Sequence, residues 1–263
     1  MTAWEMIAVA LAGLAAGSIN AVVGSGTLVT FPVLLAVGLP PVTASISNSL
    51  GLVPGGVSGV IGYRRELRGQ RRLLTTLFPA SVLGAVTGAF LLLHLPASAF
   101  EAIVPVLVGL AVVLVAVQPL LQRRLAARRA RSGVDAEAPQ VIGPGRRSAL
   151  VAAAYATGTY GGYFAASQGV LQIGIFGLLL RESLQRLNAI KLVLTLAVNT
   201  VAAVTYVAVA ADRIDWAAAG LVAAGSLVGG YLGSTVGRRL PAPALRAGIV
   251  VLGIVAIVVL LTR

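Results

Sequence analysis

Apolar stretches long enough to cross a lipid bilayer recur along the whole chain. A helix needs about 20 mostly apolar residues to span the ~30 Å hydrocarbon core. Two shorter stretches, 27–38 and 170–180, would reach only about 18 Å as helices. The pattern predicts an all-α polytopic membrane protein with about eight full transmembrane helices and two short or broken helices. The expected full spans are 3–23, 42–62, 73–95, 99–121, 148–167, 187–210, 215–236 and 242–262.

The chain also repeats itself at a fixed offset of 145 residues. Two homologous halves within an apolar chain are typical of secondary transporters, which bind substrate where the halves meet. Each short stretch follows the first full span of its half, where such repeats place the site. We predict a first transmembrane repeat (1–121), a basic cytoplasmic linker (122–147) and a second repeat (148–263). The repeated glycines are Gly13, Gly17, Gly24, Gly84 and Gly88, which recur as Gly158, Gly162, Gly169, Gly229 and Gly233.

The composition supports a membrane protein and narrows its chemistry. Hydrophobic residues make up 58% of the chain and charged residues 11%, against about a quarter in soluble domains. The chain has no cysteine, and its one histidine, His94, ends a span. The acidic residues are scattered, and no G-x-x-x-x-G-K-[ST] motif is present. We therefore expect no metal or other cofactor and no direct use of ATP. The first stretch has no basic residues before it, so we expect a retained span rather than a cleaved signal peptide.

The net charge of +12 comes from arginines beside the spans. Such clusters mark the cytoplasmic face of a membrane protein. This placement argues against a nucleic-acid partner and favours the lipid bilayer, with anionic lipids at the basic loops as a further partner. The two clusters are Arg64, Arg65, Arg68, Arg71 and Arg72, and Arg123, Arg124, Arg128, Arg129, Arg131, Arg146 and Arg147.

Arginine placement also bears on the orientation of the two halves. If the short stretches cross the membrane, each half has five crossings and the second half is inverted. The residues that then join the cytoplasmic clusters are Arg181, Arg186, Arg238, Arg239 and Arg246. With four crossings per half, the halves are parallel and the 181–191 loop faces outward. The inverted arrangement satisfies the positive-inside rule better and is favoured. The linker ends in Gly143-Pro144-Gly145 and is expected to be flexible.

The segment Gly24-Ser25-Gly26 is expected to break the first helix just before the first short stretch. Broken backbone at membrane depth is tolerated only where protein or a water-filled cavity satisfies it. A helix that begins at Thr27 would direct its free N–H groups at the break, which makes an anion-binding end. Pro32 lies inside the short stretch. The expected counterpart in the second half is Gly169-Val170-Leu171, followed by Gln172.

Lys191 is the only lysine among 20 basic residues, and no acid lies deep in any span to pair with it. A buried cation without a counter-ion is costly. Lys191 therefore either extends its long stem to the interface or pairs with an anion. Asn188, Thr195 and Asn199 share its helical face, which resembles a cavity lining. Both interpretations stay open.

Other polar residues gather near the two expected breaks. Each alone is more often an interhelical hydrogen bond than a ligand contact. Pro54 and the two glycines after it are either a hinge or a static kink. The predicted substrate-binding residues are Asn20, Ser25, Gly26, Thr27, Asn48, Gln168, Gly169, Gln172, Lys191 and Asn199. The predicted hinge or packing residues are Gly24, Pro32, Pro54, Gly55, Gly56, Gly161 and Gly162.

Several of these segments resemble the TauE/SafE sulfite-exporter family, also called toluene-sulfonate uptake permeases. The run 17–32 (GSINAVVGSGTLVTFP) is similar to the first signature of that family, and 48–56 and 63–67 are similar to later segments of its first half. In the second half, 160–169 and 187–191 resemble a branch of the family. The chain departs from the common triple glycine after each break, which bears on the substrate more than on the fold. The resemblance implies a multi-pass inner-membrane transporter of small sulfur-containing or organic anions such as sulfite or sulfonates.

These observations together predict a secondary transporter that works by alternating access. An inside-negative potential favours anion exit by ~2.3 kcal/mol per charge per 100 mV, and no buried acid offers a proton relay, so we expect export. An anion channel is the alternative, although a selectivity filter needs rings of loops. A membrane enzyme is disfavoured because the chain lacks cysteine, clustered acids and a deep histidine.

Overall fold

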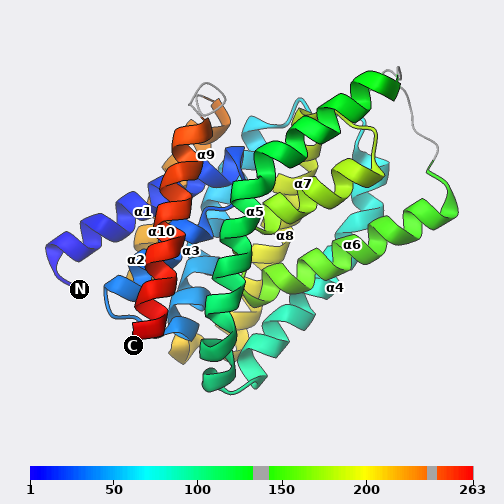
Figure 1. Ribbon diagram of the computed structural model, residues 1–263. Helices are drawn as coiled ribbons and strands as arrows, with labels where there is room; N and C mark the ends of the chain where they lie inside the picture. The colour runs from blue at the N-terminus through cyan, green and yellow to red at the C-terminus, as the bar shows by residue number, and fades with distance from the viewer. Residues whose placement is uncertain (133–141, 236–241, 263) are drawn as a thin grey trace.

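The computed structural model describes residues 1–132, 142–235 and 242–262, and within these ranges it is helical and has no strand (Figure 1). The all-α prediction is therefore confirmed for the described chain. The helices are α1 (Ala3–Val22), α2 (Thr27–Ala36), α3 (Pro41–Gly62), α4 (Arg71–His94), α5 (Ala97–Ser132), α6 (Pro144–Tyr163), α7 (Gln168–Leu179), α8 (Leu184–Val209), the 3-10 turn η1 (Ala211–Arg213), α9 (Trp216–Thr235) and α10 (Ala242–Thr262).

Each of the eight predicted spans overlaps a helix of the described chain, although the span predicted at 148–167 runs past the end of α6 at Tyr163. Five helical segments of the described chain are long and apolar enough to cross a membrane. These segments are α1, α4, residues 97–127 of α5, α8 and α9. The stretches α2 and α7 are short apolar helices, as predicted. The helix α3 is long enough to cross a membrane, but its polar residues make it less apolar than those five segments. Four of these polar residues are buried, namely Ser45, Ser47, Asn48 and Ser49. The helix α3 packs mainly on α9 and α8.

The segment predicted as a flexible linker is helical at both ends. The helix α5 continues through Ser132, and α6 begins at Pro144. Residues 122–132 are mainly Leu, Ala, Arg and Gln, which are strong helix formers, and this explains why the helix extends past 121. The prediction of a flexible linker is therefore wrong for these residues, and 133–141 lie outside the described residues.

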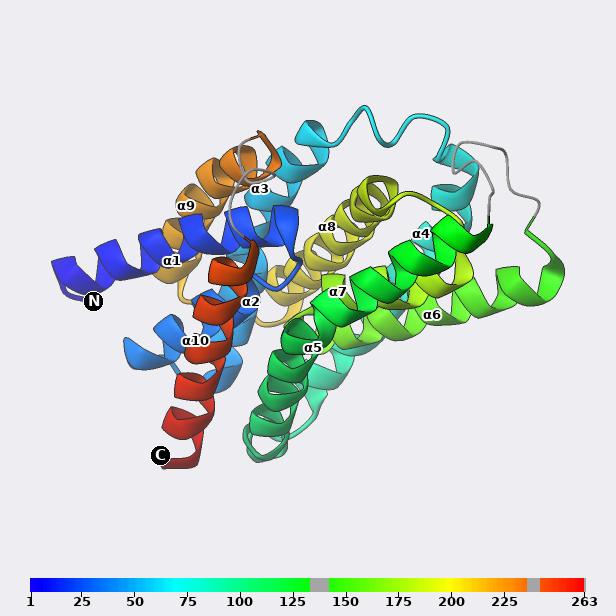
Figure 2. The same cartoon turned by 45° about the horizontal axis from the view of Figure 1, so that its top comes forward.

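The helices form two groups, and each group combines helices of both halves. The first group contains α1, α2 and α3 with α9 and α10, and the second contains α6, α7 and α8 with α4 and α5. The groups meet where α3 packs on α8 and where α10 packs on α5. The offset of 145 relates α1 to α6 and α4 to α9. Each group contains one of these equivalent pairings, because α1 packs on α9 in the first group and α6 packs on α4 in the second. Figure 2 shows the groups side by side, with α3 and α8 facing each other between them.

The repeated glycines lie at the closest helix contacts. A Cβ atom added at Gly13 would lie 2.7 Å from the carbonyl oxygen of Val222, and one at Gly158 would lie 2.5 Å from that of Ser81. Gly88 and Gly233 would meet backbone oxygens equally closely, at 2.1 and 2.5 Å. These distances leave no room for any side chain, so the glycine spacing does hold the helices together as predicted.

Candidate functional site

The first break lies where α1 ends at Val22 and α2 begins at Thr27. Gly24 in this break has a φ of +91°, which side chains disfavour. A Cβ atom added at Gly24 would lie 2.9 Å from the Cα atom of Gly169, and one added at Gly169 would lie 2.8 Å from the Cα atom of Gly24. Two glycines that are equivalent in the repeat therefore touch each other. Their contact marks the place where the two halves of the chain meet.

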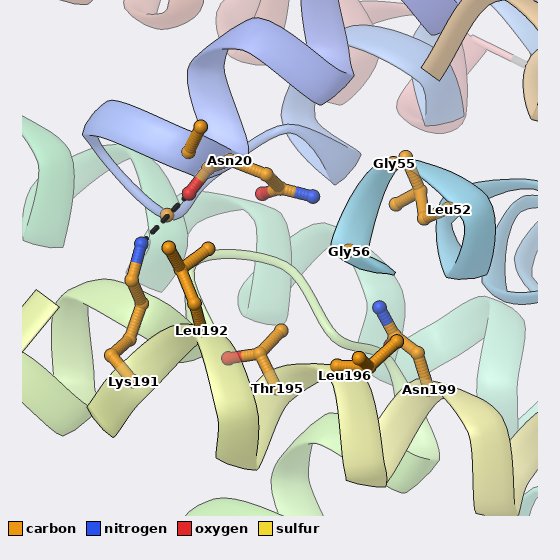
Figure 3. Close-up of a pocket in the computed structure, with 11 residues that line it drawn as sticks. Asn20, Leu52, Gly55, Gly56, Lys191, Leu192, Thr195, Leu196 and Asn199 are labelled. Atoms are coloured by element: carbon orange, nitrogen blue, oxygen red, sulfur yellow. Dashed lines mark hydrogen bonds between the residues drawn. The ribbon is translucent and has the colours of Figure 1, made fainter. Parts of the chain in front are cut away.

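Lys191 of α8 reaches the end of α1 at this junction. Its Nζ atom donates to the carbonyl oxygen of Asn20 at 2.7 Å (Figure 3). The last carbonyls of a helix lack partners and carry a partial negative charge, so a cation is favourable there. The Asn20 side chain spans the break, since its Oδ1 atom accepts from the backbone N–H of Gly26 at 2.7 Å.

Two amide side chains hold the next carbonyls of the same helix end. Asn188 of α8 donates to the Ala21 oxygen at 2.8 Å, and Gln118 of α5 donates to the Val23 oxygen at 3.3 Å. Asn188 was predicted to lie on the polar face but not among the site residues, and Gln118 was missed. An amide deep in the apolar α5 is the signal that could have indicated Gln118.

Lys191 is 1% exposed, and its Nζ atom is held inside the protein by the Asn20 carbonyl oxygen. The interpretation that its charge extends to the interface is therefore wrong. Within the described residues no carboxylate lies within 4.0 Å of Lys191, whereas Arg186 on the same helix pairs with Glu182 at 3.2 Å. Among the described residues, the Lys191 ammonium therefore contacts the negative end of the α1 dipole and no carboxylate.

A cavity lies between the end of α1, α3 and α8. Figure 3 shows Lys191, Thr195 and Asn199 along one side of α8, opposite Gly55 and Gly56 of α3. The free volume is about 20 Å³, room for about one water molecule. The remaining residues that line it are Asn20, Ala21, Gly24, Leu52, Leu192 and Leu196. Of the predicted binding residues, Asn20, Lys191 and Asn199 line this cavity, and Gly169 lies against Lys191 and Gly24.

Asn48 and Thr27, two other predicted binding residues, belong to a separate network. The Asn48 Nδ2 atom donates to the Thr27 hydroxyl at 3.3 Å, and its Oδ1 atom accepts from the Thr30 hydroxyl. Both ends of the Asn48 amide therefore attach α2 to α3. Thr30 was missed, because a threonine in an apolar helix gives no distinctive pattern.

The remaining predicted binding residues do not line the cavity. The Gln172 Oε1 atom accepts from the Thr195 hydroxyl at 3.1 Å, which ties α7 to the cavity wall. Gln168 lies against Gly161, and its side-chain amide is buried without a partner in the described chain. The Ser25 hydroxyl is likewise buried and unpartnered. Unpaired buried polar groups are rare and indicate a place where a ligand or water could bind.

The second break lies one helical turn earlier in the repeat than expected. The helix α6 ends at Tyr163 and α7 begins at Gln168, so the segment from Gly169 to Leu171 is helical. The prediction of a break at 169–171 is therefore wrong. At this break the left-handed conformation is adopted by Ala165 and Ser167, with φ angles of 62° and 59°, and not by a glycine. For this reason the sequence has no turn signal here.

The glycines predicted as hinge or packing residues make close contacts. Added Cβ atoms would lie 2.6 Å from the Ser226 oxygen at Gly55, 3.0 Å from Leu196 at Gly56 and 2.4 Å from the Ala85 oxygen at Gly162. Pro54 and Pro32 lie inside α3 and α2. These contacts account for the glycines as packing residues, and a hinge at Pro54 stays a prediction.

Comparisons with known proteins agree with this architecture. The chain is 35% identical over 99 residues to a probable membrane transporter protein, ORF9, of Sinorhizobium sp, which covers 37% of each chain. It is 32% identical over 97 residues to the probable membrane transporter protein YfcA of Escherichia coli K12, which covers 35% of each. The matched region thus spans little more than a third of each relative. No solved structure matches the chain.

The profile of the family described as Sulfite exporter TauE/SafE matches residues 9–260, nearly the whole chain. With its apolar helices and the junction of its two broken helices, the chain belongs to the TauE/SafE sulfite exporter family of membrane transporters.

Proposed function

We propose that the chain is a secondary transporter that exports small anions, such as sulfite or sulfonates, through the Gly24–Gly169 junction. The observation that carries this proposal is Lys191, a fully buried cation that lines a cavity there without a carboxylate partner in the described chain. An ammonium held only by a helix-end carbonyl keeps most of its charge uncompensated. An anion that enters the cavity would supply the missing negative charge.

Neutral groups around Lys191 suit an oxyanion. Asn20 and Asn199 line the same cavity, and the Ser25 hydroxyl and the Gln168 amide are buried and unpartnered near the breaks. Hydroxyl and amide groups can donate to anion oxygens without adding charge. In the proposal Lys191 transfers its hydrogen bond from the Asn20 carbonyl to the anion, so that binding loosens the contact between α1 and α8.

Alternating access is supported by the small volume of the cavity and by the two helix groups. A volume of about 20 Å³ has no room for sulfite, so binding requires the groups to move apart on one side. An open channel would need a continuous pore instead. The mixed composition of the groups means that such a movement rearranges both halves at once.

The arrangement of the basic loops supports inverted halves. The Arg186 Nη2 atom donates to the Arg68 carbonyl at 3.3 Å, so the first turn of α8, within the predicted 181–191 loop, lies beside the loop after α3. The parallel eight-span arrangement would put these two loops on opposite faces of the membrane. Their contact favours ten crossings, with both basic loops in the cytoplasm. An inside-negative potential then drives anions outward.

The test is sulfite and small-sulfonate flux in proteoliposomes under an imposed potential, for the wild type and Lys191→Met. We expect potential-driven flux that falls at least about tenfold in Lys191→Met, because one lost buried charge contact is worth more than ~1.4 kcal/mol. Arg186→Gln removes a positive charge from the same helix outside the cavity and is the matched control. Size-exclusion and thermal-unfolding profiles verify that the variants fold.

The outcomes separate the parts of the proposal. Equal flux in the wild type and Lys191→Met would contradict the role of Lys191. Equal loss in Arg186→Gln would mean that overall charge, rather than the cavity, controls flux. Absence of flux for every anion would contradict the substrate class, and single-channel currents would contradict a carrier.

A further inference from the structure

A basic cluster lies at the beginning of the α4–α6 helix pair. Arg71 and Arg72 are the first residues of α4, and Arg146 and Arg147 lie in the first turn of α6. All four side chains are exposed. Neither helix contains an acidic residue. The cluster therefore has no counter-charge from its own two helices.

The two helices run parallel, so the four arginines lie at the same end. A Cβ atom added at Gly84 would meet the Tyr155 oxygen at 2.2 Å, and one at Gly88, one turn later, would meet the Thr159 oxygen at 2.1 Å. Toward the beginning of the pair, the Ser81 hydroxyl donates to the Ala154 oxygen at 3.4 Å. The residue numbers of α4 and α6 therefore rise in the same direction along the contact, and Figure 1 shows the same parallel course.

An apolar groove begins at this cluster and runs between the two helices. It is an open surface groove of about 510 Å³. Arg147 and Ser148 lie at its basic end, and Leu83, Val151, Ala152 and Tyr155 line its length. The Tyr155 hydroxyl pairs with Thr87 at 3.1 Å, so the polar tip of this side chain is already satisfied. The groove thus offers a cationic end and an otherwise apolar wall.

The equivalent helix pair of the other group, α1 and α9, has the opposite charge at its beginning. The helix α1 carries Glu5 in its first turn, and Asp215 caps the N-terminus of α9 by accepting from the Ala218 N–H at 2.8 Å. Asp212 and Arg213 precede α9 and balance each other formally. The two pairs share the same glycine packing, so the arginines are a particular feature of the α4–α6 pair and not a consequence of the fold.

We propose that the α4–α6 groove binds an anionic phospholipid, with its phosphate at Arg147 and the neighbouring arginines and one acyl chain along the groove. A phosphodiester supplies the charge that the cluster lacks, and arginine is suited to phosphate oxygens. The apolar wall contacts the chain, which a soluble phosphate could not use. This site is separate from the Lys191 cavity and does not depend on the proposed transport.

The test is native mass spectrometry of the full chain equilibrated with equal phosphatidylglycerol and phosphatidylcholine. The Arg146→Gln/Arg147→Gln variant removes the headgroup contacts, and Ala152→Trp fills the groove from an exposed position. Arg123→Gln/Arg124→Gln is the matched control, since it removes two exposed arginines from α5, which packs mainly on α10 and α7. We expect retained phosphatidylglycerol in the wild type and in the control. We expect about thirtyfold weaker retention in the Arg146/Arg147 variant and a loss in Ala152→Trp.

Each alternative result overturns the proposal. Equal loss in the control would indicate attraction by total charge without a site. Retention in Ala152→Trp would indicate a headgroup contact without the groove, and equal retention of phosphatidylcholine would remove the charge selection. Thermal unfolding of each variant in detergent checks the fold, and flux measurements report separately on the Lys191 cavity.

Discussion

At the first break the carbonyls that end α1 receive one ammonium and two amides from other helices, whereas the second break is held by hydroxyl groups. There the Tyr160 hydroxyl donates to the Ala166 oxygen at 2.5 Å, and the Ser167 hydroxyl donates to the Ala111 oxygen at 3.3 Å. The two breaks lie in corresponding parts of the two repeats, but only the first carries a charge.

The backbone of the two breaks differs as well. Gly24 supplies the left-handed conformation at the first break, and Ala165 and Ser167 supply it at the second. The first break therefore reaches the left-handed conformation with a glycine, which has no side chain to strain. The second break reaches it with residues that carry side chains and are strained there. We infer that the first break is the place where the anion acts, and that the second is a rigid neutral partner.

The largest expected effect comes from a side chain at the glycine contact. In Gly24→Ala, the φ of +91° costs about 1–2 kcal/mol, and overlap with the Gly169 Cα atom costs about 1–3 kcal/mol more. We expect a strongly lowered unfolding temperature in detergent and loss of anion flux.

Gly38→Ala is the matched control for this substitution. Gly38 has a φ of +93°, but an added Cβ atom would meet nothing within 4 Å. Gly38→Ala should therefore lower the free energy of unfolding only by the cost of the positive φ, about 1–2 kcal/mol, and should keep the anion flux of the wild type. If both variants unfold at the same temperature, the contact between the halves at Gly24 contributes nothing to stability.

A smaller effect is expected when a neutral donor at the first break is removed. Asn188→Leu leaves the buried Ala21 carbonyl unpaired, which costs about 1–3 kcal/mol of stability. The Lys191 ammonium stays in place, so potential-driven flux should stay within about threefold of the wild type per folded protein. Unfolding temperature and flux measured side by side with Lys191→Met separate helix capping from charge. A tenfold loss of flux in Asn188→Leu would show that Lys191 has no special role.

Much of the fold could be predicted from the sequence, because apolar length and glycine spacing are local patterns. They indicated the helices and the close contacts at Gly13 and Gly158. The charge of Lys191 was also predictable as an anomaly, because no deep acid could pair with it. Its actual partner, the Asn20 carbonyl, depends on how α8 of one half meets α1 of the other, and no local pattern encodes this contact.

Other parts of the site could not be predicted for equally physical reasons. The offset of 145 placed the second break at Gly169, but the helix breaks one turn earlier at residues that have no turn preference. Tertiary contacts, such as the Tyr160 hydroxyl on the Ala166 oxygen, impose that conformation. Asn48 was predicted to bind a ligand because several polar residues gather near the two expected breaks, but its amide connects α2 and α3.

The smallest expected effect tests whether the second break is strained. Ala165→Gly removes the Cβ atom from a left-handed residue, a gain of about 1–2 kcal/mol, and adds about 0.5–1 kcal/mol of chain entropy to the unfolded state. The net result should be a slight stabilisation, up to about 1 kcal/mol, with unchanged flux. Ala166→Gly, at a fully buried neighbour without a positive φ, should instead destabilise by about 0.5–1 kcal/mol. Unfolding temperatures of the two variants should therefore move in opposite directions. A shift of both to lower temperature would mean that Ala165 is relaxed, and the two breaks would then differ in charge alone.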